Sequence, residues 1–225
     1  MNIAIIPARK KSKRVPKKNI KLFNGKPMIY WSIKAALNSK LFQKVIVSTD
    51  DKKIASISKK FGAEVPFIRP INLSSDHVST TEVVAHAIRY LDRKNTNYKF
   101  VCCIYPTSPF INFTDIQKGF KEIKTNKYNF VFSASKNYLP ILRSFTFYNN
   151  KGVKMTFPKY TNYRTQDLSN SYIDAGQFYW GKKEAWLKKL NIFNQYSNII
   201  LVPRERFIDI DTKDDWEFAK KMLKF

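Results

Sequence analysis

Short apolar runs alternate with stretches of helical periodicity through the first two thirds of this chain. The apolar runs that we expect to form strands are residues 2–7, 45–49, 64–68, 100–104 and 130–132. The stretches that we expect to form helices are residues 27–39, 51–61, about 80–91 and about 114–125. The third of these helices should be capped by Thr80 or Thr81. Alternation of this kind predicts an α/β protein with a single open, mostly parallel twisted sheet and helices on both faces.

Composition indicates how large a core the chain can bury and where in the cell it is expected. The 225 residues, 44% of them hydrophobic, can bury one core without disulfide or metal staples, so we predict one domain over residues 1–225. Cys102 and Cys103 are adjacent in an apolar run, which is typical of a buried strand and not of a disulfide or zinc site. No apolar stretch approaches the roughly 20 residues that span a bilayer. We therefore expect a cytoplasmic protein without a membrane partner.

The formal net charge of +24 is compatible with a nucleic-acid partner, because proteins that follow a phosphate backbone need clustered lysine and arginine. In this chain the lysines are spread over almost every expected helix. Dispersed positive charge favours solubility and non-specific attraction over a recognition surface. We expect no specific nucleic-acid partner, and a non-catalytic basic nucleic-acid-binding protein stays open as the alternative from another class.

The regular alternation ends in residues 135–170, which are aromatic and rich in turn-forming residues. Two alternating runs, 145–148 and 153–155, flank the sequence Asn149-Asn150-Lys151-Gly152, and this pattern predicts a hairpin. Such an excursion is either a lid or an oligomerisation arm, and its apolar, alternating pattern favours the arm. Beyond it we expect strands at 172–181 and 199–202 and a helix at 216–223.

A turn dense in positive charge follows the first apolar run. Seven of the residues 8–19 are lysine or arginine. A buried strand that ends in a loop of cations and free backbone amides is a common phosphate site at the carboxyl edge of an α/β sheet. A lysine run can also be ordinary solvated surface. The strand in front of the loop and the stiffening effect of Pro16 favour a site for a polyanion.

Two carboxylates occur close together near the end of the chain. Residues 207–212 alternate with period two, so in an extended segment Asp209 and Asp211 project from one face while the isoleucines face the core. Neighbouring carboxylates repel unless a cation lies between them, and Mg²⁺ prefers oxygen ligands of this kind. The alternative is a helix cap, because Thr212 with Asp215 resembles a capping box. The loop of residues 8–19, which we call the cationic loop, favours the metal site, because nucleotide chemistry needs both a site for the phosphates and a metal ion.

Six motifs follow one another along nearly the whole chain: Ala8-Arg9-x-x-Ser12-Lys13-Arg14-x-Pro16-x-Lys18-Asn19, Arg69-Pro70 with Asp76, Ser79-Thr80-Thr81, Pro106-Thr107-Ser108-Pro109, Arg164-Thr165-Gln166-Asp167-Leu168 and Asp209-Ile210-Asp211. In this order they resemble the cytidylyltransferases that activate nonulosonic acids, which are the sialic-acid CMP synthetases and their relatives. Residues 105–110 and 171–181 resemble the members that act on pseudaminic acid. The resemblance implies a fold of the nucleotide-diphospho-sugar transferase type with a β-rich dimerisation arm at about 135–170.

The resemblance also implies roles for individual residues. Arg9, Lys13 and Asn19 would hold the triphosphate, whereas Arg69 and Thr80 would lie near the cytosine or the ribose. The full set implied for nucleotide binding is Ala8, Arg9, Ser12, Lys13, Asn19, Arg69, Ser79 and Thr80. The set implied for sugar binding is Tyr105, Arg164, Gln166, Asp174 and Gln177. Asp209 and Asp211 would bind Mg²⁺ and would act in catalysis together with Arg9 and Lys13.

The activity implied by the resemblance is transfer of CMP from CTP to the anomeric hydroxyl of a nine-carbon keto sugar acid by a homodimer, with release of pyrophosphate. Sialic-acid enzymes typically carry glutamine at the place of Tyr105, arginine at Ile111 and an Asn-Gly pair at Ala175-Gly176, and these differences favour pseudaminic acid. N-acetylneuraminic acid and legionaminic acid stay open as alternatives. Neither histidine is expected in catalysis, because His77 lies in a polar loop and His86 on the solvent side of its helix by spacing.

Overall fold

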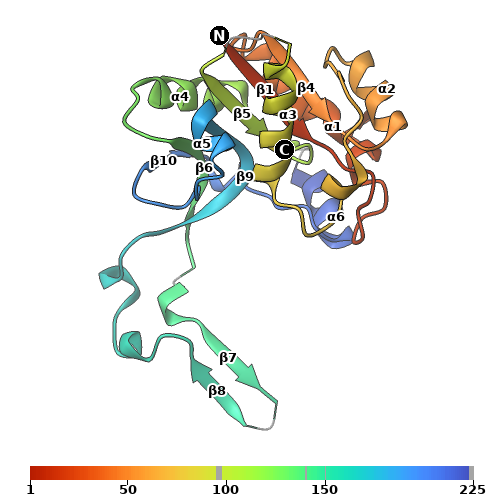
Figure 1. Cartoon of the computed structure of the whole chain (residues 1–225). Helices are drawn as coiled ribbons and strands as arrows, with labels where there is room; N and C mark the ends of the chain where they lie inside the picture. The colour runs from red at the N-terminus through yellow and green to blue at the C-terminus, as the bar shows by residue number, and fades with distance from the viewer. Residues whose placement is uncertain (95–97, 140, 150, 223–225) are drawn as a thin grey trace.

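The central sheet has six strands in the order β10-β6-β9-β5-β1-β4, in a computed structural model that describes residues 1–94, 98–139, 141–149 and 151–222. Its strands are β1 (Asn2–Pro7), β4 (Lys44–Ser48), β5 (Phe100–Ile104), β6 (Phe130–Asn137), β9 (Ser171–Lys182) and β10 (Ser197–Leu201). Strand β1 pairs in parallel with β4 and β5, β10 pairs in parallel with β6, and β9 runs antiparallel between β5 and β6. The prediction of an open, mostly parallel sheet is confirmed (Figure 1).

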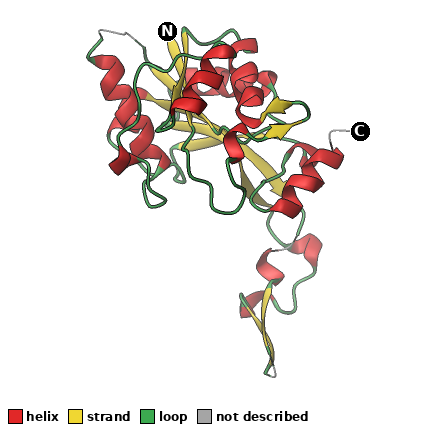
Figure 2. Cartoon of the chain, turned by 90° about the vertical axis from the view of Figure 1, so that its right-hand side faces the viewer, coloured by secondary structure: helices red, strands yellow, loops and turns green. Residues whose placement is uncertain are grey.

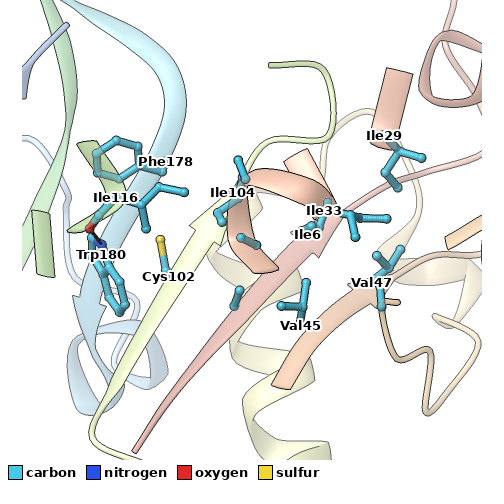
Figure 3. Close-up of a cluster of buried hydrophobic side chains, with 14 of the residues drawn as sticks. Ile6, Ile29, Ile33, Val45, Val47, Cys102, Ile104, Ile116, Phe178 and Trp180 are labelled. Atoms are coloured by element: carbon cyan, nitrogen blue, oxygen red, sulfur yellow. Dashed lines mark hydrogen bonds between the residues drawn. The ribbon is translucent and has the colours of Figure 1, made fainter. Parts of the chain in front are cut away.

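Helices cover both faces of this sheet, as the alternation of the sequence predicts. One face carries α1 (Met28–Asn38), α2 (Lys52–Lys60) and α4 (Phe113–Lys124), and the other carries α3 (Thr80–Asp92) and α5 (Lys183–Leu187). The side chains of β1 alternate between the two faces. Ala4 and Ile6 therefore join Ile33 of α1 in one buried cluster, which Figure 3 shows, whereas Ile3 and Ile5 join α3 in the other. Strands β1, β4 and β5, which contribute to both clusters, are buried on both sides.

Cys102 and Cys103 lie in the middle of β5 and are fully buried free thiols, one in each cluster. Burial raises the pKa of both thiols, so they remain protonated. The prediction that they are small apolar side chains of a buried strand is confirmed.

A third cluster ties the end of the chain to its beginning. Helix α6 (Lys213–Met222) buries Trp216 completely, with its ring 5.4 Å from that of Phe23 in an edge-on arrangement. Phe23 belongs to a two-stranded ribbon of β2 (Leu22–Phe23) and β3 (Lys26–Pro27), and Val15 and Ile210 pack in the same cluster. This packing brings residues 207–212 next to the loop that follows β1. Helix α6 begins three residues earlier than predicted, and Leu223 lies outside the described residues.

The predicted hairpin is present, and it extends away from the sheet as an arm (Figures 1 and 2). Its strands β7 (Phe145–Tyr148) and β8 (Gly152–Met155) pair antiparallel, and Asn150 in the turn lies outside the described residues. Three short 3-10 helices belong to the arm: η3 (Ile141–Arg143), η4 (Pro158–Tyr160) and η5 (Thr165–Asp167). Phe145 and Phe147 are 60% and 67% exposed, so the arm presents aromatic rings to its surroundings.

Two local predictions were wrong. Residues 64–68 form no continuous strand: Glu64 and Ile68 make single parallel bridges to β4 and the residue after it, because Pro66 between them has no N–H to donate. The cap of α3 is Ser79, not Thr80 or Thr81, and its hydroxyl and the Glu82 carboxylate form a complete capping box. In the described part of the chain, no helix is long and apolar enough to cross a membrane.

Gly119 marks a contact where α4 lies against β9. A Cβ atom at this position would lie 2.7 Å from Trp180 and 2.9 Å from Phe178, and the Trp180 ring is held by a hydrogen bond to the Ile116 carbonyl oxygen (2.9 Å). We expect Gly119→Val to lower the free energy of unfolding by about 1–3 kcal/mol through overpacking. Thermal unfolding measures the effect, with Lys121→Val on the exposed face of the same helix as control. Equal melting temperatures for the two variants would contradict the prediction.

Candidate active site

The loops that follow β1 and β5 meet the segment between α2 and α3 at the carboxyl edge of the sheet, around a cavity of about 590 Å³. Six cationic residues line this cavity, which we call the cationic cavity: Arg9, Lys11, Lys13, Arg14, Lys18 and Arg69. Ser12, Asn19 and Thr80 line it too, as do the two acidic residues Asp76 and Asp211. The structure thus brings the cationic loop from the start of the chain and an aspartate from its end into one cavity. Such a cavity is suited to a polyanion.

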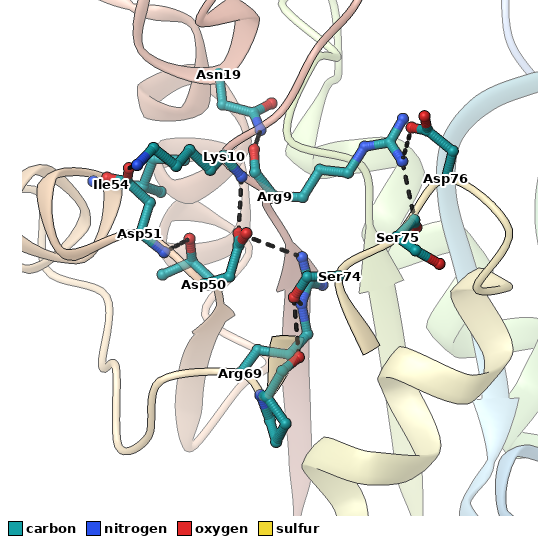
Figure 4. Close-up of polar contacts among 12 residues, drawn as sticks. Arg9, Lys10, Asn19, Asp50, Asp51, Ile54, Arg69, Ser74, Ser75 and Asp76 are labelled. Atoms are coloured by element: carbon teal, nitrogen blue, oxygen red, sulfur yellow. Dashed lines mark hydrogen bonds and ion pairs between the residues drawn. The ribbon is translucent and has the colours of Figure 1, made fainter. Parts of the chain in front are cut away.

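The shape of the cationic loop is fixed by hydrogen bonds rather than by secondary structure. The Ala8 amide donates to the Ser48 carbonyl oxygen (2.9 Å), which extends the β1–β4 ladder by one residue. The buried side chain of Asn19, on the 3-10 helix η1 (Lys18–Ile20), donates to the Arg9 carbonyl oxygen (2.8 Å) (Figure 4). Ala8 and Asn19 were predicted as nucleotide ligands, and here both hold the loop; Ala8 does not line the cavity.

Arg9 and Lys13 both contact the carboxylate of Asp76. Nη1 of Arg9 lies 2.5 Å from one oxygen, and Nζ of Lys13 lies 2.6 Å from the other. These contacts, above all the hydrogen bond from Lys13, hold the pKa of Asp76 below its usual value. The two cations predicted to bind the triphosphate therefore already share an anionic partner.

Arg69 is the buried cation of the cavity, at 4% exposure. Its Nε donates to the Ser74 hydroxyl (3.2 Å), and its Nη2 lies 3.8 Å from Asp50 at the end of β4. Burial lowers the pKa of this guanidinium, and the charge of Asp50 opposes that shift. Thr80 lies on the same side of the cavity, 3.2 Å from the Tyr105 hydroxyl. The predicted ligand Ser79 does not line the cavity, because its hydroxyl caps α3.

A second cavity of about 340 Å³ adjoins the first, and Tyr105 and Thr107 line both. Asp174 lines the second cavity, and its carboxylate accepts hydrogen bonds from the Tyr179 hydroxyl (2.5 Å) and from the Gly176 amide (2.9 Å). Burial raises the pKa of Tyr179, so this hydroxyl keeps its proton and acts as the donor.

Gln177 also lines the second cavity, and it is 4% exposed. Its Nε2 donates to the Arg206 carbonyl oxygen (2.7 Å), while its Oε1 has no hydrogen-bond partner within the described residues.

The two predicted metal ligands divide between the cavities. Asp211 lines the cationic cavity, with one oxygen 2.8 Å from Arg14 and 3.4 Å from Lys18, whereas Asp209 lines the second cavity. The pKa of Asp209 is raised, first by partial desolvation of its carboxylate and then by the negative charge of Asp211. Their segment is not part of a strand, although Ile210 is buried as predicted.

The helix cap predicted as the alternative is present at the residues that follow, Thr212 and Asp215. The Asp215 carboxylate accepts from the Thr212 amide (2.7 Å), and the Thr212 hydroxyl accepts from the Asp215 amide (3.1 Å). The carboxylate of Asp211 takes no part in this cap, because it faces Arg14 and Lys18. The cap and a metal site can therefore exist side by side.

Two neighbouring carboxylates at the edge of the cationic cavity fit Mg²⁺, which keeps water and substrate phosphate oxygens in its coordination shell. Asp209 and Asp211 are close enough for the charge of one to raise the pKa of the other, so a cation near both is favoured. No group of three histidine, cysteine, aspartate or glutamate residues that could hold a metal occurs in the described part of the chain. A metal there would thus depend on these two carboxylates together with oxygen ligands from water and substrate.

Two predicted sugar ligands lie away from both cavities. Arg164 and Gln166 belong to the exposed arm, where Arg164 pairs with Asp167 at 2.9 Å. Neither residue lines the cationic or the second cavity.

His86 was predicted to face solvent, and this is wrong. It is half-buried with its ring 5.1 Å from that of Phe67, and its Nδ1 has no partner within the described residues. Burial lowers the pKa of His86. The irregular segment that carries Phe67 covers this side of α3, and helical spacing alone gives no sign of that cover. His77 is exposed in its loop, as expected.

Comparison with known proteins identifies the family. The family model described as cytidylyltransferase matches residues 3–222, and the chain belongs to this family. It is 44% identical to the pseudaminic acid cytidylyltransferase of Campylobacter jejuni subsp. jejuni serotype O:2, over 99% of this chain and 96% of the relative. It is 32% identical to the N-acylneuraminate cytidylyltransferase of Escherichia coli O18:K1:H7, over 96% of this chain and 51% of the relative.

A solved structure supports the fold. The structure of CMP:2-keto-3-deoxy-manno-octonic acid synthetase complexed with CTP superposes with a TM-score of 0.73 at 15% identity, covering 99% of this chain and 98% of that one. This superposition agrees with the fold type that the motifs predict, and the family and the 44% identical relative make the chain an enzyme of the nucleotidyltransferase class.

Asp76 should compete with the nucleotide for Arg9 and Lys13. Because its carboxylate occupies the position of an anion between these cations, we expect Asp76→Asn to lower the KM for CTP several-fold with little change in kcat. The effect should shrink as salt is added, since salt screens exposed charges. Asp92→Asn is the control, because Asp92 pairs with Lys183 (2.6 Å) and lines neither cavity. A raised KM for CTP in Asp76→Asn would contradict competition and would mean that Asp76 orients the two cations.

Proposed function

We propose that this enzyme transfers CMP from CTP to the anomeric hydroxyl of pseudaminic acid and releases pyrophosphate. The observation that carries the proposal is the pair of adjoining cavities that share Tyr105 and Thr107. One is rich in cations and suits a triphosphate, whereas the other is lined by polar groups such as Asp174 and suits a sugar. The 44% identity to a protein named pseudaminic acid cytidylyltransferase supports this choice of sugar.

The reaction needs the sugar oxygen and the α-phosphorus of CTP to meet at the boundary between the cavities. The anomeric oxygen forms a bond to the α-phosphorus, the bond to the bridging oxygen breaks, pyrophosphate leaves and the hydroxyl proton passes to water. Arg9 and Lys13 exchange Asp76 for phosphate oxygens and neutralise the charge that grows on pyrophosphate. Holding both substrates in line accounts for a large part of the rate enhancement in such a transfer.

Asp209 and Asp211 are the residues that would hold Mg²⁺, which when bound supplies positive charge to phosphate oxygens and favours an ionised hydroxyl. Asp211 faces the cationic cavity and Asp209 faces the second one, so the pair stands at the boundary where the bond forms. On the sugar side, Asp174 is kept as a hydrogen-bond acceptor by Tyr179 and the Gly176 amide, and it can orient a hydroxyl or amide of the substrate.

The assembly that we propose is a homodimer in which residues 135–170 of the single domain reach the neighbouring subunit. The exposed aromatic rings of β7 support a covered position for this arm. Arg164 and Gln166 would then act in the neighbour's sugar site, since they are remote from the cavities of their own chain. The cytoplasmic location stays a prediction.

Asp209→Asn and Asp211→Asn should each lower kcat by about 10²-fold or more, in the range seen when one group that stabilises charge in a transition state is removed. Asp214→Asn, in the exposed first turn of α6 and in neither cavity, should keep the wild-type kcat and lower the melting temperature slightly, because it removes a negative charge from the helix N-terminus. Steady-state kinetics and thermal unfolding of the three variants measure both effects. Wild-type kcat in both Asp209→Asn and Asp211→Asn would reduce the pair to a structural role.

Pyrophosphate release identifies the substrates. The protein is incubated with Mg²⁺, each of the four nucleoside triphosphates, and pseudaminic, legionaminic or N-acetylneuraminic acid. We expect turnover with CTP and pseudaminic acid, and loss of turnover when EDTA removes divalent metal. Turnover with another of these acids would replace the proposed sugar. The non-catalytic alternative would be favoured if no turnover is observed and the protein binds nucleic acid with an affinity that falls steeply with salt and does not change when CTP is added.

A further inference from the structure

A buried ion pair borders the second cavity. Asp115, in the first turn of α4, has 1% of its side chain exposed, and its Oδ2 lies 2.5 Å from Nη1 of Arg206. Arg206 ends the 3-10 helix η6 (Arg204–Arg206) and lines the cavity. The exposed side chain of Lys118 reaches the other oxygen of Asp115 at 3.3 Å. A carboxylate buried this deeply requires a partner, so α4 and η6 are held together at this point.

Gln177 connects the same arginine to the wall that both cavities share. Its side-chain Nε2 donates to the Arg206 carbonyl oxygen (2.7 Å), and its backbone carbonyl accepts from the Tyr105 amide (2.9 Å). Gln177 is almost fully buried on β9, so it has little freedom to move. One residue thus fixes the distance between Tyr105 and the main chain at Arg206.

The main chain at Arg206 leads directly to the two carboxylates. Asp209 follows three residues later, and residues 207–211 belong to no helix or strand. The far end of this segment is anchored, because the Asp211 amide donates to the Asp215 carboxylate (3.0 Å) and Ile210 is buried. At the near end, Asp115 holds the guanidinium of Arg206 and Gln177 holds its carbonyl oxygen, while Ile208 packs partly buried against the cluster that contains Trp216. Because Arg206 fixes the main chain three residues before Asp209, the position of Asp209 depends on the contacts of Arg206.

We infer that Asp115, Arg206 and Gln177 are positioning residues that set where Asp209 stands in the second cavity, an inference that rests on the proposed function. None of them lines the cationic cavity, so they act on the sugar side and not on the binding of the triphosphate. A displacement of reacting groups by about 1 Å can cost about 10²-fold in rate. Loss of the ion pair would release the main chain at Arg206 and could displace Asp209 by such a distance.

Kinetics of Arg206→Gln, with CTP and the sugar acid varied separately, test this assignment. We expect kcat to fall at least tenfold and the KM for the sugar to rise, while the KM for CTP stays within twofold. Arg206→Lys should recover part of the loss, because lysine can pair with Asp115 but has no planar fork. Lys118→Gln is the matched control, since it removes the exposed partner of Asp115 and should behave as wild type. Wild-type kcat and sugar KM in Arg206→Gln would overturn the inference.

A second readout does not need turnover. Electron paramagnetic resonance of Mn²⁺ added to the protein–CTP complex reports the metal site, and calorimetry without metal reports CTP binding. We expect Arg206→Gln to weaken Mn²⁺ binding severalfold, in the direction of Asp209→Asn, and to leave CTP binding unchanged. Unchanged Mn²⁺ binding in a folded Arg206→Gln variant would overturn the positioning role. If the wild type turns over none of the sugar acids, the proposed function fails, and the Mn²⁺ measurement still decides the positioning role.

Discussion

Positive charge concentrated at the carboxyl edge of the sheet is the constraint on which the site depends, and three aspartates balance it. Asp50 follows β4 and holds the Lys10 amide and Arg69, Asp76 precedes α3 and holds Arg9 and Lys13, and Asp211 precedes α6 and holds Arg14 and Lys18. Each aspartate comes from a different segment of the chain. The loop after β1 is thus the common partner through which these segments are fixed relative to one another.

The three aspartates are not equally available for exchange with a ligand. Asp50 is paired with Arg69, whose side chain is 3% exposed, and its oxygen also accepts a backbone amide, so this contact belongs to the framework. Asp76 is 31% exposed and binds only flexible side chains, one of them the 81% exposed Lys13. Exchange of Asp76 for a phosphate costs little desolvation, because the pair is already open to water. The cavity can accept a polyanion without disturbing the contacts that shape it.

Local sequence patterns predicted most of the fold and the residues of the cationic loop. The hairpin arm and the strands of the sheet follow from alternation and turn residues, whereas Pro66 interrupts an apolar run that otherwise reads as a strand. The cap of α3 was placed one or two residues late, because Ser79 and the two threonines after it are chemically similar caps and only the reciprocal contact with Glu82 separates them.

The rest of the site depends on contacts between distant parts of the chain. Asp115 and Arg206 lie 91 positions apart, and neither stands out in its own segment as a member of a pair. Asp209 and Asp211 were predicted as a metal site only because the chain also contains the cationic loop. The burial of Trp216 against Phe23 places the two carboxylates beside that loop. A pattern read along the chain contains no information on such packing.

Strand β9 links the second cavity to the arm by a single irregularity. Its pairing with β6 shifts between Phe132 and Ala134, and Gly176 within the shifted stretch has φ +59°, a conformation that favours glycine. The buried hydroxyl of Ser133 accepts from the amides of Gln177 and Phe178 (both 3.2 Å), so the bulged backbone keeps its hydrogen bonds.

This bulge turns Asp174 and Gln177 toward the second cavity. The same two strands then continue from Asp174 and Ala134 as a regular pair to Ser171 and Asn137, where the arm begins. The arm is thus joined to the sheet by the stretch of the β6–β9 pair that begins at Asp174 beside the second cavity. The second cavity and the arm therefore depend on the same pair of strands, whereas the loop after β1 is fixed mainly by its contacts with Asp50, Asp76 and Asp211.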